Sequence, residues 1–167
     1  TNSLGTLNLL DCLRGQPSVI AAILITSDKC YENAEWLWGY RENDRLGGRD
    51  PYSASKACAE LISKVYMQSF FEENGPNIAT TRAGNVIGGG DWASDRVVPD
   101  CVRAWSEGKP VVIRNPNATR PWQHVLEPLS GYLVLGQKLF QRDSAIKNQS
   151  FNFGPQTKVN QSVGDLI

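Results

Sequence analysis

The feature that most constrains the fold is a run of seven apolar residues, Val19 to Ile25, with no polar position in it. A strand with one face in water alternates apolar and polar residues, whereas a parallel strand covered by helices on both faces does not. The run is too short for a buried helix and much too short to cross a bilayer. It therefore predicts a parallel strand buried between two layers of helices.

Helix and strand patterns alternate on both sides of this run. Leucines recur at helical spacing between Leu4 and Leu13, and Gly15-Gln16-Pro17 ends that helix before the strand begins. Pro51 can begin a long helix that reaches about Glu73, and a second strand follows over 78–82. This order predicts an α/β fold with a doubly wound parallel sheet and right-handed crossovers.

The pattern is less regular after Gly84. It predicts a helix over about 97–107, short strands over 111–113 and 119–123, a helix over about 127–141 and the start of another helix near Ser162. We expect two domains, with residues 1–90 contributing to the doubly wound sheet and residues 91–167 forming a smaller, irregular region.

Composition excludes several classes of partner. The 17 basic residues balance the 17 acidic ones, so bulk charge favours neither nucleic acid nor an anionic membrane as a partner. Four irregularly spaced cysteines and one histidine are too few ligands for a zinc site, and buried free thiols suit a reducing cytoplasm. We expect a cytoplasmic protein with a small-molecule ligand, no metal and no membrane partner. The start at Thr1 and the end inside a predicted helix also lead us to expect a longer polypeptide.

Tyr52 and Lys56 place a phenol and an ammonium four residues apart, on one face of the helix that begins at Pro51. A nearby cation favours the phenolate, so such a tyrosine can act as a base near neutral pH. The spacing alone is weak evidence, and its context adds weight. Thr26-Ser27-Asp28-Lys29 follows the apolar run, at the carboxyl end of a strand, where open α/β sheets bind their ligands.

A serine at the end of a strand, followed 25 residues later by Tyr-x-x-x-Lys at the start of a helix, resembles the extended short-chain dehydrogenase/reductase family. The resemblance implies a Rossmann-like fold, NAD as the cofactor, and Ser27, Tyr52 and Lys56 as catalytic residues. In that family the tyrosine moves the proton of a substrate hydroxyl and the serine orients that oxygen. The lysine holds the nicotinamide ribose and lowers the pKa of the tyrosine.

Asp28 and Lys29 resemble the nucleotide-sugar dehydratases of this family rather than its epimerases. The strings over 26–33 and 47–60 resemble the branch that acts on CDP-glucose in deoxysugar and O-antigen biosynthesis. This implies oxidation at C4, loss of water across C5 and C6 with Asp28 as the proton donor, and return of the hydride to C6. Several related dehydratases carry a glutamate base where Lys29 stands, so Lys29 acts either as a neutral base or by stabilising the enolate, and both interpretations remain open.

The loop over 82–92 resembles the family's loop that passes the nicotinamide and the phosphates of the sugar nucleotide. The resemblance places Thr26, Tyr52, Lys56, Ala83, Asn85 and Val86 at the cofactor. It places Ser27, Asp28, Asn85, Arg96, Val97, Arg114 and Arg120 at the substrate, where forked guanidinium donors suit a diphosphate. By residue type alone, a helix or turn cap is the commoner role for Asp28, and a solvated surface charge is the commoner role for Arg96 and Arg120. The joint pattern of motifs favours the site roles instead.

The same resemblance implies that residues 1–90 are the second half of an NAD-binding domain and that residues 91–167 mostly bind the nucleotide sugar. It also implies a homodimer, or a dimer of dimers, formed through the first helix and the helix that begins at Pro51. The glycine-rich cofactor fingerprint is expected before Thr1, because Gly88-Gly89-Gly90 lacks the spaced third glycine. The chain alone is therefore expected to be inactive.

Two alternatives remain. One is an inverting UDP-N-acetylhexosamine 4,6-dehydratase, whose family also pairs aspartate with lysine after the strand. The other is a catalytically incomplete module that only binds a sugar nucleotide. A reading frame that continues upstream into a glycine-rich strand–turn–helix would separate the second alternative from an enzyme.

Overall fold

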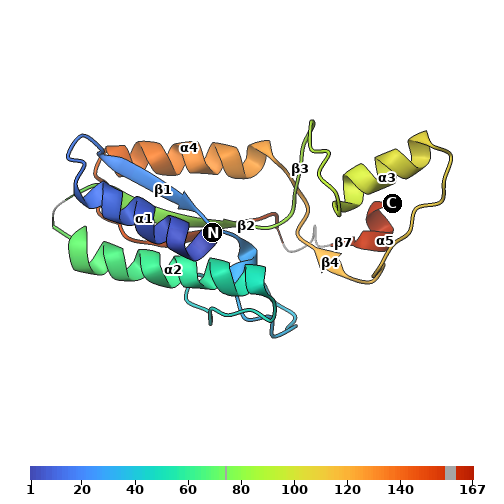
Figure 1. Ribbon diagram of the computed structural model, residues 1–167, viewed down its shortest axis with the longest axis horizontal. Coiled ribbons are helices and arrows are strands. Elements are labelled where there is room, and N and C mark those ends of the chain that lie inside the picture. The colour runs from blue at the N-terminus through green and yellow to red at the C-terminus, as the bar shows by residue number, and fades with distance from the viewer. Residues whose placement is uncertain (74, 157–160) are drawn as a thin grey trace. The chain divides into compact units, whose positions relative to one another are not determined.

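The computed structural model describes residues 1–73, 75–156 and 161–167. They form two compact units (Figure 1). The first unit comprises Thr1–Ala83 with Pro128–Phe153, and the second comprises Gly84–Glu127 with Gly154–Ile167. The units are thus discontinuous in sequence, and the first segment of the first unit ends at Ala83. The segment 128–153 joins the first unit because it supplies a helix and a strand to the sheet.

A three-stranded parallel sheet forms the centre of the first unit. Its order is β1 (Ala21–Ile25), β2 (Asn77–Ala83) and β6 (Ser150–Phe153). Ile25 lies opposite Thr81 in the β1–β2 register. The prediction that parallel strands end at Ile25 and near Arg82 is confirmed, with β2 one residue longer than expected at each end.

Helices cover both faces of this sheet (Figure 1). On one face, α1 (Asn2–Arg14) and α2 (Pro51–Phe70) enclose a core of Leu10, Leu13, Leu24, Met67, Phe71 and Ile78. On the other face, α4 (Leu126–Phe140) packs through Leu135 and Leu139 against Ala79, with Ala21 and Ile23 beside them. Alternate residues of β1 therefore enter different cores, which is why the run has no polar position.

The helix ends follow from local sequence. Gly15 caps α1, and Asp50 caps α2 with Pro51 in its first turn, where the missing proline N–H costs nothing. α2 ends at Phe70, three residues before the expected Glu73. Phe71 is almost fully buried and Gly75 takes a φ of 109°, so the backbone leaves the helix there and turns towards β2.

The second unit contains short elements. The parallel pair β3 (Val86–Ile87) and β5 (Gln123–His124) and the antiparallel pair β4 (Thr119–Arg120) and β7 (Gln161–Ser162) accompany α3 (Val97–Ser106) and α5 (Val163–Leu166). α5 begins directly after Ser162, which caps it, in agreement with the predicted helix start near this residue. None of the helices in the described residues is long and apolar enough to cross a membrane.

Two strand predictions for this half are wrong. Residues 111–113 form no strand, and the side chain of Val112 is 87% exposed, because a β-branched run without a pairing neighbour has no ladder to join. The expected strand over 119–123 is divided into β4 and β5 by Pro121 and Trp122. The sequence pattern also missed β3, β6 and β7.

Candidate active site

Ser27, Asp28 and Lys29 directly follow β1, and the last two belong to a short 3₁₀ helix, η1 (Asp28–Cys30). The buried Ser27 caps η1, because its Oγ accepts the backbone N–H of Lys29 across 3.2 Å. The same oxygen donates to Asp28 Oδ1 across 3.1 Å. The cap is therefore Ser27 and not Asp28. Asp28 is half-buried and Lys29 is exposed.

The first turns of α2 carry Tyr52 and Lys56, and η1 packs against this helix. The contact is made through a buried cluster of Cys30, Tyr31 and Ala57. Tyr52 is not part of a packed core, since its side chain is 51% exposed, and Lys56 is half-buried. Convergence of the Ser27, Tyr52 and Lys56 polar groups in one cleft stays a prediction.

The start of α2 is held by two residues that sequence reasoning did not single out. Asp50 accepts the Ser53 N–H at 3.0 Å and the Ser53 hydroxyl at 2.6 Å. These bonds lower the pKa of Asp50, and the positive charge of Lys29 lowers it further. A Cβ on Gly48 would lie 2.3 Å from Ser53 Cβ, so the preceding turn lies directly against the helix. An aspartate before proline is an N-cap signature that could have identified Asp50.

A buried ion pair joins α2 to β2. Arg82 Nη2 donates to Glu60 Oε2 across 2.7 Å, and the two residues are 3% and 2% exposed. Burial would raise the pKa of Glu60, but the hydrogen bond and charge of Arg82 outweigh it and keep the pKa below its ordinary value. An arginine in a buried strand requires a partner, which is the signal that sequence reasoning overlooked.

The other residues expected at the cofactor lie at strand ends of the first unit or in the second unit, and their hydrogen-bond partners differ. The Thr26 hydroxyl hydrogen-bonds the Glu60 carboxylate, and its backbone N–H donates to the Thr81 carbonyl at 2.8 Å. Ala83 ends β2. In the second unit, the half-buried Asn85 uses its carbonyl to accept the N–H of Gln123 at 3.2 Å, and Val86 is exposed on β3.

The candidate phosphate ligands lie in the second unit. Arg96 is exposed at the N-terminus of α3, and Val97 is the first residue of that helix. Arg114 forms an exposed ion pair with Asp95, the neighbour of Arg96 in the chain. Arg120 is half-buried on β4, where its Nη1 donates to the Thr119 carbonyl at 2.8 Å.

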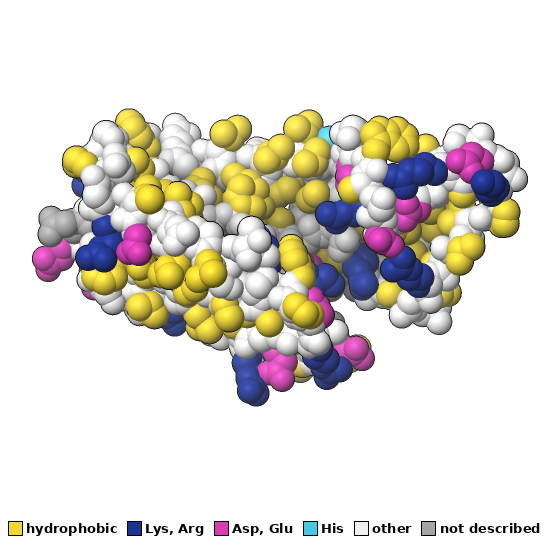
Figure 2. Space-filling model, in the orientation of Figure 1, with side chains coloured by type: hydrophobic (Ala, Val, Ile, Leu, Met, Phe, Trp, Pro, Cys, Tyr) yellow, Lys and Arg dark blue, Asp and Glu magenta, His cyan; other side chains and the backbone are white. Residues whose placement is uncertain are grey.

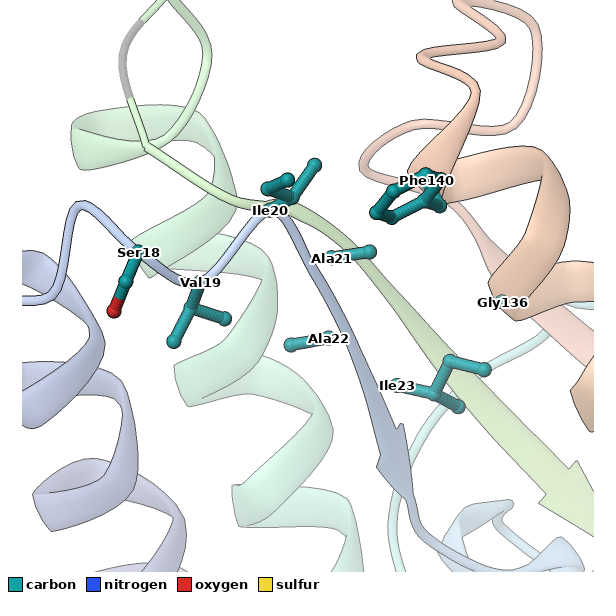
Figure 3. A pocket seen from close by; sticks show the side chains of 8 residues that line it. All are labelled: Ser18, Val19, Ile20, Ala21, Ala22, Ile23, Gly136 and Phe140. Atoms are coloured by element: carbon teal, nitrogen blue, oxygen red, sulfur yellow. The ribbon is translucent and has the colours of Figure 1, made fainter.

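An apolar groove of about 460 Å³ lies elsewhere in the first unit, beside β1 and α4. Figure 3 shows its lining, formed by Ser18, Val19, Ile20, Ala21, Ala22, Ile23, Gly136 and Phe140. No residue assigned to catalysis or to the cofactor takes part in it. Its mostly apolar surface also offers little for a sugar or a phosphate to hydrogen-bond, so the candidate site does not coincide with this groove.

Sequence comparisons identify the family of the chain. The model of the "NAD dependent epimerase/dehydratase family" matches residues 1–154. CDP-glucose 4,6-dehydratase of Salmonella typhimurium is 51% identical over the whole chain, which covers 48% of that protein. A trifunctional UDP-glucose 4,6-dehydratase, 3,5-epimerase and reductase of Arabidopsis thaliana is 29% identical over 67% of the chain and 16% of its own length. The chain thus spans about half the length of the first relative.

Solved structures show the same fold. A dTDP-glucose 4,6-dehydratase of Bacillus anthracis in complex with NAD matches 93% of this chain and 47% of its own, with a TM-score of 0.79 and 24% identity. A UDP-glucuronic acid 4-epimerase of Bacillus cereus, in complex with UDP-glucuronic acid and NAD, matches 100% of this chain and 49% of its own, with a TM-score of 0.83 and 20% identity. By sequence and fold, the chain belongs to the NAD dependent epimerase/dehydratase family.

Proposed function

We propose that this chain is a portion of a dehydratase that converts CDP-glucose into CDP-4-keto-6-deoxyglucose and water. The observation that carries the proposal is the 51% identity, over the whole chain, to CDP-glucose 4,6-dehydratase of Salmonella typhimurium. The geometry supports it, because Ser27, Asp28 and Lys29 follow β1 at the carboxyl end of the sheet and pack through η1 against the helix of Tyr52 and Lys56. In open α/β sheets this edge binds ligands.

The residues present fit the nicotinamide ribose of NAD. Tyr52 and Lys56 lie one turn apart on α2. Among the residues that the structure describes, neither of their side chains is engaged in a hydrogen bond or an ion pair. A hydroxyl and an ammonium available on one helix face suit the two hydroxyls of a ribose. When bound, NAD accepts a hydride from C4 of the sugar and later returns it to C6.

Tyr52 is the base for the C4 hydroxyl, with Ser27 holding that oxygen and Lys56 favouring the phenolate. Asp28 donates a proton to the C6 hydroxyl, which leaves as water. The hydrogen bond from Ser27 fixes the Asp28 carboxyl on the same turn. Lys29 serves the removal of the C5 proton, either as a neutral base or by stabilising the enolate.

The second unit supplies the nucleotide-sugar contacts in this proposal, as was expected of residues 91–167, and residues 1–90 carry the NAD and catalytic groups. Arg96 and Arg120 bind the diphosphate in this proposal, and Asn85, Val97 and Arg114 provide further contacts to the nucleotide sugar. The exposed guanidinium of Arg96 at the N-terminus of α3 supports this, because the helix end adds further positive potential.

The full-length protein is proposed to be a homodimer, or a dimer of dimers, formed through α1 and α2. Figure 2 shows hydrophobic side chains over these two helices. By exposed fraction, Leu4 of α1 and Leu61 and Val65 of α2 are each more than half exposed. We propose the cytoplasm as its compartment, since all four cysteines are free thiols.

The test is an assay of a full-length protein with CDP-glucose, UDP-glucose, dTDP-glucose and UDP-N-acetylglucosamine, which detects the 4-keto product. CDP-glucose is expected to give the highest kcat/KM. A preference for UDP-N-acetylglucosamine would assign the protein to the inverting hexosamine dehydratases instead. Binding of CDP-glucose without product formation would favour a catalytically incomplete binding module. The isolated 167-residue chain is expected to be inactive.

A further inference from the structure

Glu60 lies on α2, one helical turn after Lys56, and its buried carboxylate joins three strands of the first unit. Its Oε1 accepts the hydroxyl of Thr26 at the end of β1. Its Oε2 accepts Thr80 Oγ1 at 2.9 Å and Arg82 Nη2 at 2.7 Å, both from β2. Ser150 of β6 approaches the same oxygen at 3.4 Å.

Thr26 is the residue between the last position of β1 and Ser27. Its backbone N–H donates to the Thr81 carbonyl. Its hydroxyl lies within hydrogen-bond distance of Glu60 Oε1 and, at 3.0 Å, of the same Thr81 carbonyl oxygen. Because Ser27 is the next residue, this side-chain bond ties the entry of the Ser27 turn to the helix that carries Lys56.

The other end of the same turn is held by the partner of Glu60. Arg82 Nη1 donates to the hydroxyl of Tyr31, the residue that ends η1, across 2.6 Å. The Tyr31 hydroxyl donates in turn to Asn152 Oδ1 at 2.7 Å, and the guanidinium lies 4.9 Å from the centre of the Tyr31 ring. One ion pair therefore holds both ends of the turn from Thr26 to Tyr31.

A buried ion pair is often no more stabilising than apolar residues of similar volume, because desolvation offsets the attraction. Its directional bonds nevertheless restrict where the attached backbone can lie. We propose that Glu60 and Arg82 are positioning residues, which fix η1 by its two ends and thereby hold Ser27 and Asp28 against the face of α2 that carries Tyr52 and Lys56. The expected effect on kcat rests on the proposed dehydratase function. The expected fixing of the turn over 26–31 rests on the hydrogen bonds alone.

The test uses a full-length protein with four variants that leave the ion pair intact. Thr26→Val and Tyr31→Phe each remove one link to the turn, and Thr26→Ser keeps the hydroxyl. Thr80→Val is the matched control, since it also removes a hydroxyl from Glu60 but does not adjoin Ser27. Hydrogen–deuterium exchange of the amides over 26–31 is measured beside kcat, KM and the Kd for NAD. Thr26→Val also leaves Glu60 Oε1 without its bond from the Thr26 hydroxyl, which lowers stability. All measurements are therefore made well below the thermal unfolding midpoint of every variant.

Thr26→Val and Tyr31→Phe are expected to speed exchange over 26–31 and to lower kcat about 10-fold or more, since small misplacements of catalytic groups are costly. Thr26→Ser should keep the parental exchange over 26–31, because it retains the hydroxyl, and Thr80→Val should match the parent in exchange and kcat. KM and the Kd for NAD should change little in Tyr31→Phe, whose residue is not placed at the cofactor. Unchanged exchange in both link variants, or equal effects of Thr80→Val and Thr26→Val, would overturn the positioning role. If the parent does not turn over CDP-glucose, the proposed function fails, while the exchange measurement still decides whether the ion pair fixes the turn.

Discussion

Ser27 Oγ donates a hydrogen bond to Asp28 Oδ1 across 3.1 Å while accepting the N–H of Lys29 across 3.2 Å. The serine proposed to hold the substrate oxygen thus contacts the carboxyl proposed to protonate the leaving hydroxyl. Ser27, proposed to act in the oxidation at C4, and Asp28, proposed to act in the loss of water, therefore belong to one turn of backbone. A substrate bound in one position can contact both groups. This arrangement underlies the predictions about chemistry, and the packing around it underlies the predictions about stability.

In a full-length protein, Tyr52→Phe is expected to reduce turnover of CDP-glucose by about 10²–10⁴-fold, because it removes the proposed base for oxidation at C4. Product formation is followed by detection of the 4-keto sugar. Tyr66→Phe is the matched control, since this phenol is on the same helix but bonds Asp11 at 2.7 Å. Equal loss in both variants would argue for a structural effect on α2 rather than for catalysis.

Lys29→Met is expected to allow oxidation at C4 and to stall before water is lost, because Tyr52, Ser27 and Lys56 remain in place. Absorbance of the reduced nicotinamide should therefore accumulate in a single turnover. Lys64→Met, at an exposed position of α2, should show no accumulation. Formation of 4-keto-6-deoxy product by Lys29→Met at the parent rate would show that another group removes the C5 proton.

Arg82→Met is expected to destabilise the protein by about 3–5 kcal/mol at neutral pH, because it leaves the Glu60 carboxylate buried without its cation. In the parent, the folded pKa of Glu60 is below its ordinary value of 4.5, so the stability from this group is present above that pH and is lost as the pH falls through the folded pKa. In the variant, burial without the cation raises the folded pKa of Glu60. Acidification therefore protonates the carboxylate and removes the cost of a buried, unpaired charge. Denaturant unfolding measures the free energy of unfolding of both proteins from pH 8 to pH 5. The difference in this free energy between parent and variant should become smaller as the pH falls, and a constant difference would contradict this account.

Gly48→Ala is expected to lower stability by about 1–3 kcal/mol, because the added Cβ would overlap Ser53 at the start of α2. Thermal unfolding of the full-length protein measures the change. Gly39→Ala is the control, since a Cβ there meets nothing within 4 Å. If the two variants unfold at the same temperature, the turn before α2 is not closely packed in solution.

Leu61→Asp is expected to convert the full-length protein from dimer to monomer, because it places a charge on the exposed apolar face of α2. Light scattering gives the mass, and circular dichroism checks that the helix content is retained. Leu133→Asp, on the exposed face of α4, should remain dimeric. A parent protein that is monomeric by light scattering would contradict the proposed interface.

Local sequence patterns were sufficient for the main elements of the first unit apart from β6. The run from Val19 to Ile25 predicted a strand covered on both faces. β1 contributes Leu24 to one core, and Ala21 and Ile23 pack against the other, whereas Ile25 at its end is exposed. The Asp50-Pro51 start of α2 and the Ser162 start of α5 were also within reach, because caps depend on residues three or four positions apart. The family resemblance likewise depended on short strings whose members are neighbours in the chain.

Tertiary structure alone decided which strands exist and which polar groups meet. Residues 111–113 have strand propensity without a partner, whereas β6 forms because β2 offers it an edge. Thr26, Glu60 and Arg82 are far apart in sequence, so their shared network appears only when β1, β2 and α2 are packed. A helix or a cap is specified by contacts within one turn of chain, but a strand ladder or a buried ion pair requires partners that only the folded chain brings together.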